Sequence, residues 1–281
     1  MAKYKDIGGT TVGFRNGAEE YTYPSGFEGS IYYNSGNGQF EFVGTGTGAW
    51  SSGANLNTAR NDLDGSGTLT AGLAFGGNPN KAVTEEYDGS SWTESGDLNT
   101  ARRALTGFGL QTATIAAGGA EGPYNNEVEQ YDGSSWTEIA EINTAGGGSP
   151  GSCGTTTAGL VFGRRKLPGA TKGGETETWD GSSWTEVGDL NTARFSVGGL
   201  GTQTAALAVS GAPPHYANVE QWNGSAWTEV ADASAGAGKV ADSDSSSSSA
   251  FFAGGDGPPG GAVNSTEEWT FSHSVKTVTT S

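Results

Sequence analysis

The chain has 281 residues, of which 49 are glycine and 33% are hydrophobic, and 14 basic against 31 acidic residues give it a formal charge of −17. A surface this acidic repels phosphate backbones, so we expect no nucleic-acid partner. The single cysteine, Cys153, excludes an intrachain disulfide. No stretch approaches the roughly 20 apolar residues of a membrane span, so we expect no membrane insertion.

The N-terminal segment, residues 1–49, stands outside the repeats that follow it. Its start, MAKYKDIGGTTVGF, lacks the apolar core of a signal peptide, so we expect synthesis in a cytoplasm without a cleaved signal. From Ile31, the stretch IYYNSGNGQFEFVG places aromatic and β-branched residues on both sides of an Asn/Gly/Ser cluster, which predicts a β-hairpin. Residues 1–25 have no clear period and are expected to form an arm that docks onto another molecule or frays.

The rest of the chain, residues 50–281, is organised around one repeated stretch. It reads EEYDGSSWTESGDLNTAR at residues 85–102 and returns in variants further along. The anchor residues Trp50, Trp92, Trp136, Trp184 and Trp227 are spaced by 42, 44, 48 and 43 residues. A strand-rich unit copied at this period is typical of propeller blades. We therefore predict an all-β fold, a five-bladed β-propeller over residues 50–281, with the N-terminal hairpin and arm as an extension that serves docking or ring closure.

Each repeat divides into four expected strands. In one copy these are RALTGFG from Arg103, TATIAAGG from Thr112, a strand that ends in EQYD, and WTEI after the turn GSS. Four strands per period is the content of a propeller blade. From the arginine of TAR to the end of the glycine pair the distance is 17 residues in three copies, which confines insertions to the loop between the second and third strands.

The C-terminal copy is the most divergent. Its run DSDSSSSSA at 242–250 falls on the first strand and turn of the expected fifth blade, and we interpret it as a degenerate strand. The last residues, SVKTVTTS, alternate β-branched side chains and are expected to complete this blade or close the ring. A sixth, composite blade made from the N-terminal hairpin and the C-terminal strand is an open alternative.

Glycine pairs recur at Gly76–Gly77, Gly118–Gly119 and Gly254–Gly255, each followed at a distance by Tyr or Trp and then by Trp. This pattern resembles the kelch repeat of galactose-oxidase-type propellers. The sequence pattern LNTAR…TQTAALA…EEYDGSSWTE resembles that of kelch-like proteins of marine bacteriophages. The third copy (VFGRR) and the fourth (VSGA) depart from the glycine pair. The resemblance implies a propeller in a virion, and kelch propellers serve mostly as binding platforms.

Two enzymatic readings of the repeat are not supported by its residues. The copper site of galactose oxidase needs two histidines and a cysteine cross-linked to tyrosine, whereas His215, His273 and Cys153 fall on different blades or the tail. The segment YDGSSW resembles the Asp-box of sialidases, but Asp88 and Gly89 are adjacent, which is a tight-turn signal. We expect no enzymatic activity.

Arginines recur at one position of three copies, Arg60, Arg102 and Arg194. We expect them to hold strand ends through backbone carbonyls, because arginine offers five donors. An anion site near the propeller axis is the alternative.

Paired aspartates on the inner strands of the first and fifth expected blades form a candidate calcium site. Asp64 and Asp242 each lie 13 residues before the second glycine of their copy, and these blades are neighbours in a closed five-blade ring. Hard oxygen ligands in this number suit Ca²⁺. The candidate ligands are Asp62, Asp64, Asp242 and Asp244. The alternative is a solvated acidic channel with no metal and no cofactor.

The loops between second and third strands form a candidate binding surface, because all are expected to emerge on one face. They vary in length and hold the basic cluster of the chain, in which Lys172 follows three consecutive cations. Rigid aromatic side chains beside amides and arginines suit sugar or protein recognition. The candidate binding residues are Tyr124, Asn125, Asn126, Arg164, Arg165, Lys166, His215 and Tyr216. Tolerated drift on an exposed edge is the alternative.

These observations together predict a non-enzymatic structural protein of a phage virion, made in the host cytoplasm. It would be displayed in multiple copies on tail or capsid, contact other virion proteins through residues 1–49, and bind a host-surface glycan or protein through the loops. Two alternatives remain open: a purely structural assembly subunit, and an intracellular bacterial protein-interaction module.

Overall fold

The structure of the protein, a computed structural model, describes residues 53–166 and 171–238 in full, and elsewhere the backbone of the further strands named below. The chain divides into two compact units, Met1–Ser52 and Gly53–Ser281. In the first unit, β1 (Ile31–Asn34) pairs antiparallel with β2 (Gln39–Phe42), which confirms the predicted hairpin. The arm at residues 1–25 lies outside the described residues.

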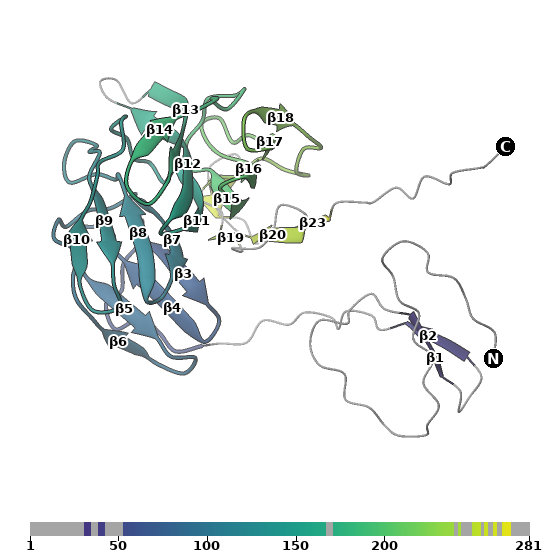
Figure 1. The fold of residues 1–281 in the computed structure, drawn as a ribbon, viewed down its shortest axis with the longest axis horizontal. Coiled ribbons are helices and arrows are strands. Elements are labelled where there is room, and N and C mark those ends of the chain that lie inside the picture. Colours follow the sequence, from purple (N-terminus) through teal and green to yellow (C-terminus); the bar gives the residue numbers. More distant parts are fainter. Residues whose placement is uncertain are drawn as a thin grey trace. The chain divides into compact units, whose positions relative to one another are not determined.

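The second unit is built from antiparallel four-stranded sheets that follow one another in sequence order (Figure 1). Each sheet runs from its first to its fourth strand without a crossover, as in a propeller blade. The sheets are β3–β6 (Asp64–Thr68, Ala71–Phe75, Thr84–Tyr87, Trp92–Glu94), β7–β10 (Thr106–Leu110, Ala113–Ala117, Val128–Tyr131, Trp136–Glu138), β11–β14 (Gly151–Thr155, Ala158–Lys166, Thr171–Trp179, Trp184–Glu186) and β15–β18 (Gly198–Thr202, Ala205–Val209, Val219–Trp222, Trp227–Glu229). The all-β propeller prediction is confirmed.

The predicted number of five blades is wrong, because the part of the chain that the structure describes forms four four-stranded blades. The fifth repeat yields a three-stranded sheet of β19 (Ala241–Asp242), β20 (Ser249–Ala253) and β23 (Thr266–Thr270), and a separate pair of β21 (Asp256–Gly257) and β22 (Gly261–Ala262). Two features of the sequence explain this. The fifth copy has no DGSSWTE segment to form a turn and a fourth strand, and the residues from Asp242 to Ser248, where its first strand is expected, are all Asp or Ser, which favour strands poorly.

The hydrophobic core lies between successive blades. Leu73 and Phe75 of β4 pack against Ala116, Tyr131 and Trp136 of the second blade. The aromatic ring of Phe75 requires a glycine in the next blade, because a Cβ on Gly107 of β7 would lie 2.3 Å from Cζ of Phe75. In the second strand β4, Leu73 and Phe75 thus share the face that packs on the next blade, and the expected alternation of large and small residues is present.

The anchor tryptophans join neighbouring blades. Nε1 of Trp136 donates to Oγ1 of Thr84 in the preceding blade at 2.9 Å, and the ring centroids of Trp136 and Phe75 are 5.1 Å apart. Trp227 repeats this contact with Thr176 at 3.0 Å, two blades later. The repeated tryptophan is thus an inter-blade residue, which explains why it recurs once per blade.

The Asp-Gly segments form the predicted tight turns between third and fourth strands. Oδ1 of Asp88 accepts hydrogen bonds from the backbone amides of Ser90 and Ser91, both at 2.8 Å, and Gly89 has φ +93°. These hydrogen bonds, with the Ser90 hydroxyl first among them, lower the pKa of Asp88 to about 2. Asp132 and Asp180 make the same turn.

A buried glutamate ties the LNTAR loop to each blade. In the second blade Oε2 of Glu129 accepts from the backbone and side-chain nitrogens of Asn99 at 2.7 and 2.9 Å, and Arg102 lies 3.2 Å from Oε1. Arg60 donates to the carbonyls of Gly76 and Ala74 at 2.9 and 3.1 Å. The expectation that these arginines hold strand ends through backbone carbonyls is confirmed, and the glutamate is their ionic partner.

The third blade builds the same clamp from exchanged residues. Its loop has Gly146 where the other copies have arginine, and Arg164 stands where they have the second glycine of the pair. Nη1 of Arg164 lies 2.9 Å from Oε1 of Glu177 and donates to the carbonyl of Thr144 at 2.6 Å. The β12–β13 register shifts between Phe162 and Arg164, so that the arginine joins an extended nine-residue strand.

Candidate functional site

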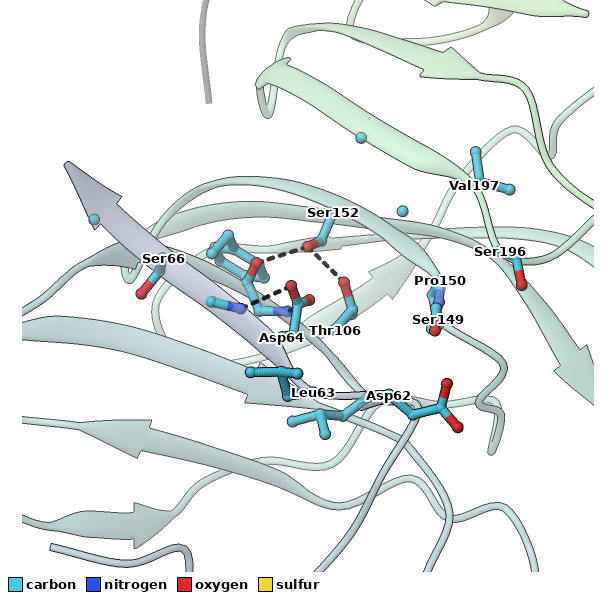
Figure 2. Close-up of a pocket in the computed structure, with 17 residues that line it drawn as sticks. Asp62, Leu63, Asp64, Ser66, Thr106, Ser149, Pro150, Ser152, Ser196 and Val197 are labelled. Atoms are coloured by element: carbon cyan, nitrogen blue, oxygen red, sulfur yellow. Dashed lines mark hydrogen bonds between the residues drawn. The ribbon is translucent and has the colours of Figure 1, made fainter. Parts of the chain in front are cut away.

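The innermost strands of the four blades, β3, β7, β11 and β15, contact one another in sequence order. They line a cavity of about 520 Å³ whose wall includes Asp62, Asp64 and Pro150 and is rich in hydroxyl groups (Figure 2). Oγ1 of Thr106 and Oγ of Ser152 are 2.7 Å apart, and Oγ of Ser152 also donates to the carbonyl of Gly107 at 3.0 Å. The hydroxyls thus connect adjacent blades across the cavity wall.

The carboxylate of Asp64 is bound into this wall by hydrogen bonds. Oδ2 accepts from the amide of Gly107 at 2.7 Å and Oδ1 from its neighbour Gly65 at 2.8 Å, as Figure 2 shows. Burial raises the pKa of Asp64 to about 6, although the hydrogen bonds from Gly65, Gly107 and Thr106 oppose the rise. Asp64 therefore bridges the first and second blades.

Of the four aspartates of the expected calcium site, the structure describes the side chains of Asp62 and Asp64 alone. Both line the cavity, and Asp64 turns its carboxylate to the second blade. Asp242 belongs to β19, of which the structure describes the backbone alone, and Asp244 lies outside the described residues. Within residues 53–166 and 171–238 no group of three or more His, Cys, Asp or Glu could hold a metal ion.

The loops between second and third strands emerge on the same side as the LNTAR loops, and we call this side the loop face. Tyr124 packs over the next LNTAR loop, since a Cβ on Gly147 would lie 2.5 Å from Cδ1 of Tyr124. Asn125 pairs its backbone with Gly119 and Gly146, both at 3.0 Å, and Asn126 donates to Glu141 at 2.7 Å. These three residues hold the loop in place.

Arg164 lies at the loop-face end of its blade, but its side chain is not exposed there, which corrects its assignment as a binding residue. Its side chain is fully buried in the ion pair with Glu177. Of the neighbouring cations, Lys166 forms an ion pair with Glu175, and Arg165 is half-buried. The sequence misplaced Arg164 because VFGRR reads as the start of a loop, whereas β12 continues through it to Lys166.

The remaining candidates lie in the loop of the fourth blade. The carbonyl of His215 packs against Gly236, because a Cβ on Gly236 would lie 2.1 Å from that oxygen. The hydroxyl of Tyr216 accepts a hydrogen bond from Nζ of Lys172 at 2.6 Å. Phe195, which sequence reasoning missed, lies under Arg165, with the guanidinium carbon 5.3 Å from the ring centroid. The sequence does not single out Phe195 as a site residue, because the other copies have Asn61, Arg103 and Gly147 at that position.

The cations of the described blades all lie at one face, whereas carboxylates lie at both. Every Lys and Arg between residues 53 and 238 lies at the loop-face end of its blade: Arg60, Lys81, Arg102, Arg103, Arg164, Arg165, Lys166, Lys172 and Arg194. The opposite face has the tight turns with Asp88, Asp132 and Asp180, and none of its turns in these blades contains a cation. Carboxylates such as Asp97, Glu121 and Asp189 also lie at the loop-face end, so the loop face can bind an anion only where a cation is not paired.

The blade arrangement defines the protein as a β-propeller. Among solved structures 211 chains match it. One of them, the structure of YjhT, is 14% identical with a TM-score of 0.59, and the match covers 72% of this chain and 74% of that chain. Similarity at this identity concerns the fold alone. No protein-family model and no curated protein sequence matches the chain. Within the described residues, no helix has the length and apolar character needed to cross a membrane.

Proposed function

We propose that the protein is a non-enzymatic kelch-type propeller of a bacteriophage particle that binds a host-surface molecule through its loop face. The observation that carries this proposal is the contrast between constant strands and variable loops. The inner two strands have five residues each in three of the four blades, while the loops 76–83, 118–127, 167–170 and 210–218 differ in length and composition. Loops that vary on a rigid scaffold are where binding usually evolves.

The N-terminal unit supplies the attachment to the particle in this proposal. The division of the chain after Ser52 supports a unit that can be removed as a whole. Deleting residues 1–52 should release a folded propeller from particles. Loss of folding on deletion would instead assign this unit to the propeller itself.

A second role, as an assembly subunit, is favoured by one observation on the opposite face. The large hydrophobic side chains that are exposed in the described structure are Leu69, 88% exposed in the turn between β3 and β4, and Leu110, 59% exposed at the end of β7. Exposed apolar side chains of this kind suit contact with another particle protein. The same face could therefore seat the propeller on its neighbours.

The test compares two matched triple variants for binding to intact host cells and for incorporation into particles. Tyr124→Ala/Arg165→Ala/Tyr216→Ala alters the loop face and leaves Arg164 in place. Leu69→Ala/Leu110→Ala/Thr157→Ala alters turns on the opposite face. We expect the first to lose cell binding and retain incorporation. If the first variant retains cell binding, the loop face is not the receptor site. If the second variant blocks incorporation into particles, the assembly role of the opposite face applies.

A further inference from the structure

The hairpin of β12 and β13 places two cations directly opposite each other. Arg165 and Lys172 are register partners on these antiparallel strands, so their side chains emerge on the same side. Like charges in directly opposed positions destabilise a sheet. The hairpin tip therefore holds positive charge at a cost to the fold, in a chain whose formal charge is −17.

Most other cations of the loop face are neutralised by a carboxylate. The four clamp arginines pair with buried glutamates, and Lys166 pairs with Glu175. Within the described part of the chain, neither Arg165 nor Lys172 forms an ion pair. Four cations and two carboxylates leave residues 164–177 with a formal charge of +2.

Both unpaired cations are held in place by aromatic residues of the fourth blade. The guanidinium of Arg165 stacks over Phe195, and Nε of Arg165 is buried without a hydrogen-bond partner. Nζ of Lys172 donates to the hydroxyl of Tyr216. An aromatic face and a neutral phenol orient a cation but leave its charge in place. The seam between the third and fourth blades thus presents two fixed positive charges.

We propose that this seam binds the carboxylate of an acidic saccharide, with Arg165 and Lys172 as its two cationic contacts. The inference rests on the proposed loop-face function and specifies its ligand. A planar guanidinium matches a carboxylate, and an ammonium beside it adds a point charge. The acidity of the whole chain disfavours a polymer that is densely charged along its length, whereas two local cations suffice for one carboxylate.

The test measures binding of oligosaccharides that end in glucuronate or galacturonate by titration calorimetry, with the methyl ester of each as a neutral probe of the same shape. We expect the acids to bind and the esters to bind at least about tenfold more weakly, because a hydrogen bond to a charged group is lost. Arg165→Gln and Lys172→Gln should each weaken the acids by about tenfold. Lys81→Gln, which removes a cation of the same face in the first blade, should leave binding unchanged.

Thermal unfolding of each variant separates loss of binding from loss of folding. Tyr216→Phe checks the positioning of Lys172, because it removes the hydroxyl that holds this ammonium and leaves the charge unchanged. No acid bound by the wild type at millimolar concentration, or equal binding of acid and ester, would overturn the inference. The inference would also be overturned if Lys81→Gln weakened binding of the acids as much as Arg165→Gln and Lys172→Gln do. Retained binding of the wild type to host cells in those cases would leave the loop-face function standing.

Discussion

Arg164 occupies the space that a side chain on Gly146 would need, because a Cβ on Gly146 would lie 2.6 Å from Cδ of Arg164. In the first blade the roles are reversed: a Cβ on Gly77 would lie 3.0 Å from Cδ of Arg60. One arginine and one glycine thus fill the same volume from opposite sides, and the buried glutamate receives its cation in either arrangement.

This exchange predicts coupling between the two positions. Arg164→Gly should lower the free energy of unfolding by about 3–5 kcal/mol, because it leaves Glu177 buried without its cation. Gly146→Arg should also destabilise, because two arginines then compete for one space. The double variant should be more stable than the sum of the two losses allows, as urea denaturation would measure. Additive losses would contradict the exchange.

The buried glutamates should matter far more than the glutamates opposite them. Glu129 and Glu138 are register partners in β9 and β10, but Glu129 is buried in the clamp and Glu138 is exposed. Glu129→Gln should cost about 3–5 kcal/mol, because Arg102 loses its buried partner. Glu138→Gln should change stability by at most about 0.5 kcal/mol. Chemical denaturation of the two variants checks this, and equal effects would refute the clamp.

The tryptophan contact between blades predicts a cost for removing its acceptor. Thr84→Val keeps the shape of the side chain but leaves the indole N–H of Trp136 buried without a partner. We expect a loss of about 1–3 kcal/mol. In the Trp136→Phe background the same substitution should have a smaller effect, because no donor remains to be satisfied. An undiminished effect in that background would mean that Thr84 acts through packing alone.

Asp64 predicts a dependence of stability on pH. Its pKa is raised from 3.8 to about 6, so the folded protein binds this proton more tightly than the unfolded chain does. The free energy of unfolding should therefore fall as the pH rises from about 4 to about 6. Two pKa units set an upper limit of about 3 kcal/mol, and solvent in the cavity reduces it.

The Asp64→Asn variant should lack this component, and the stability difference between the wild type and the variant should change across that range. Carboxyl carbon NMR should place the midpoint of Asp64 near pH 6. A midpoint near 3.8 would show that the cavity does not desolvate the group.

The sequence predicted the features that are repeated and local. Asp-Gly turns, the period of the tryptophans and the alternation in the second strands were sufficient to identify blades, because each arises from neighbouring residues. The number of blades was not predictable in this way, since it depends on whether the fifth copy keeps a fourth strand, and a count of repeats treats a degenerate copy as a complete one.

Side-chain placement at the site was harder to predict. The position of Arg164 depends on a register shift between β12 and β13, and the contact of Phe195 with Arg165 depends on how two blades pack. Neither leaves a periodic signal in the sequence. The direction of Asp64 also depends on packing, because its partner, Gly107, belongs to the next blade.

The cations of the described blades all lie at the loop-face end, but carboxylates lie there too, among them Asp97, Glu121, Glu141 and Asp189. Opposite charges this close together largely cancel at distances beyond the Debye length, so the cations of this face act on a group only once it comes into contact with them. Recognition at this face would then depend on the local placement of charges, and added salt should weaken the contact more than it slows the approach.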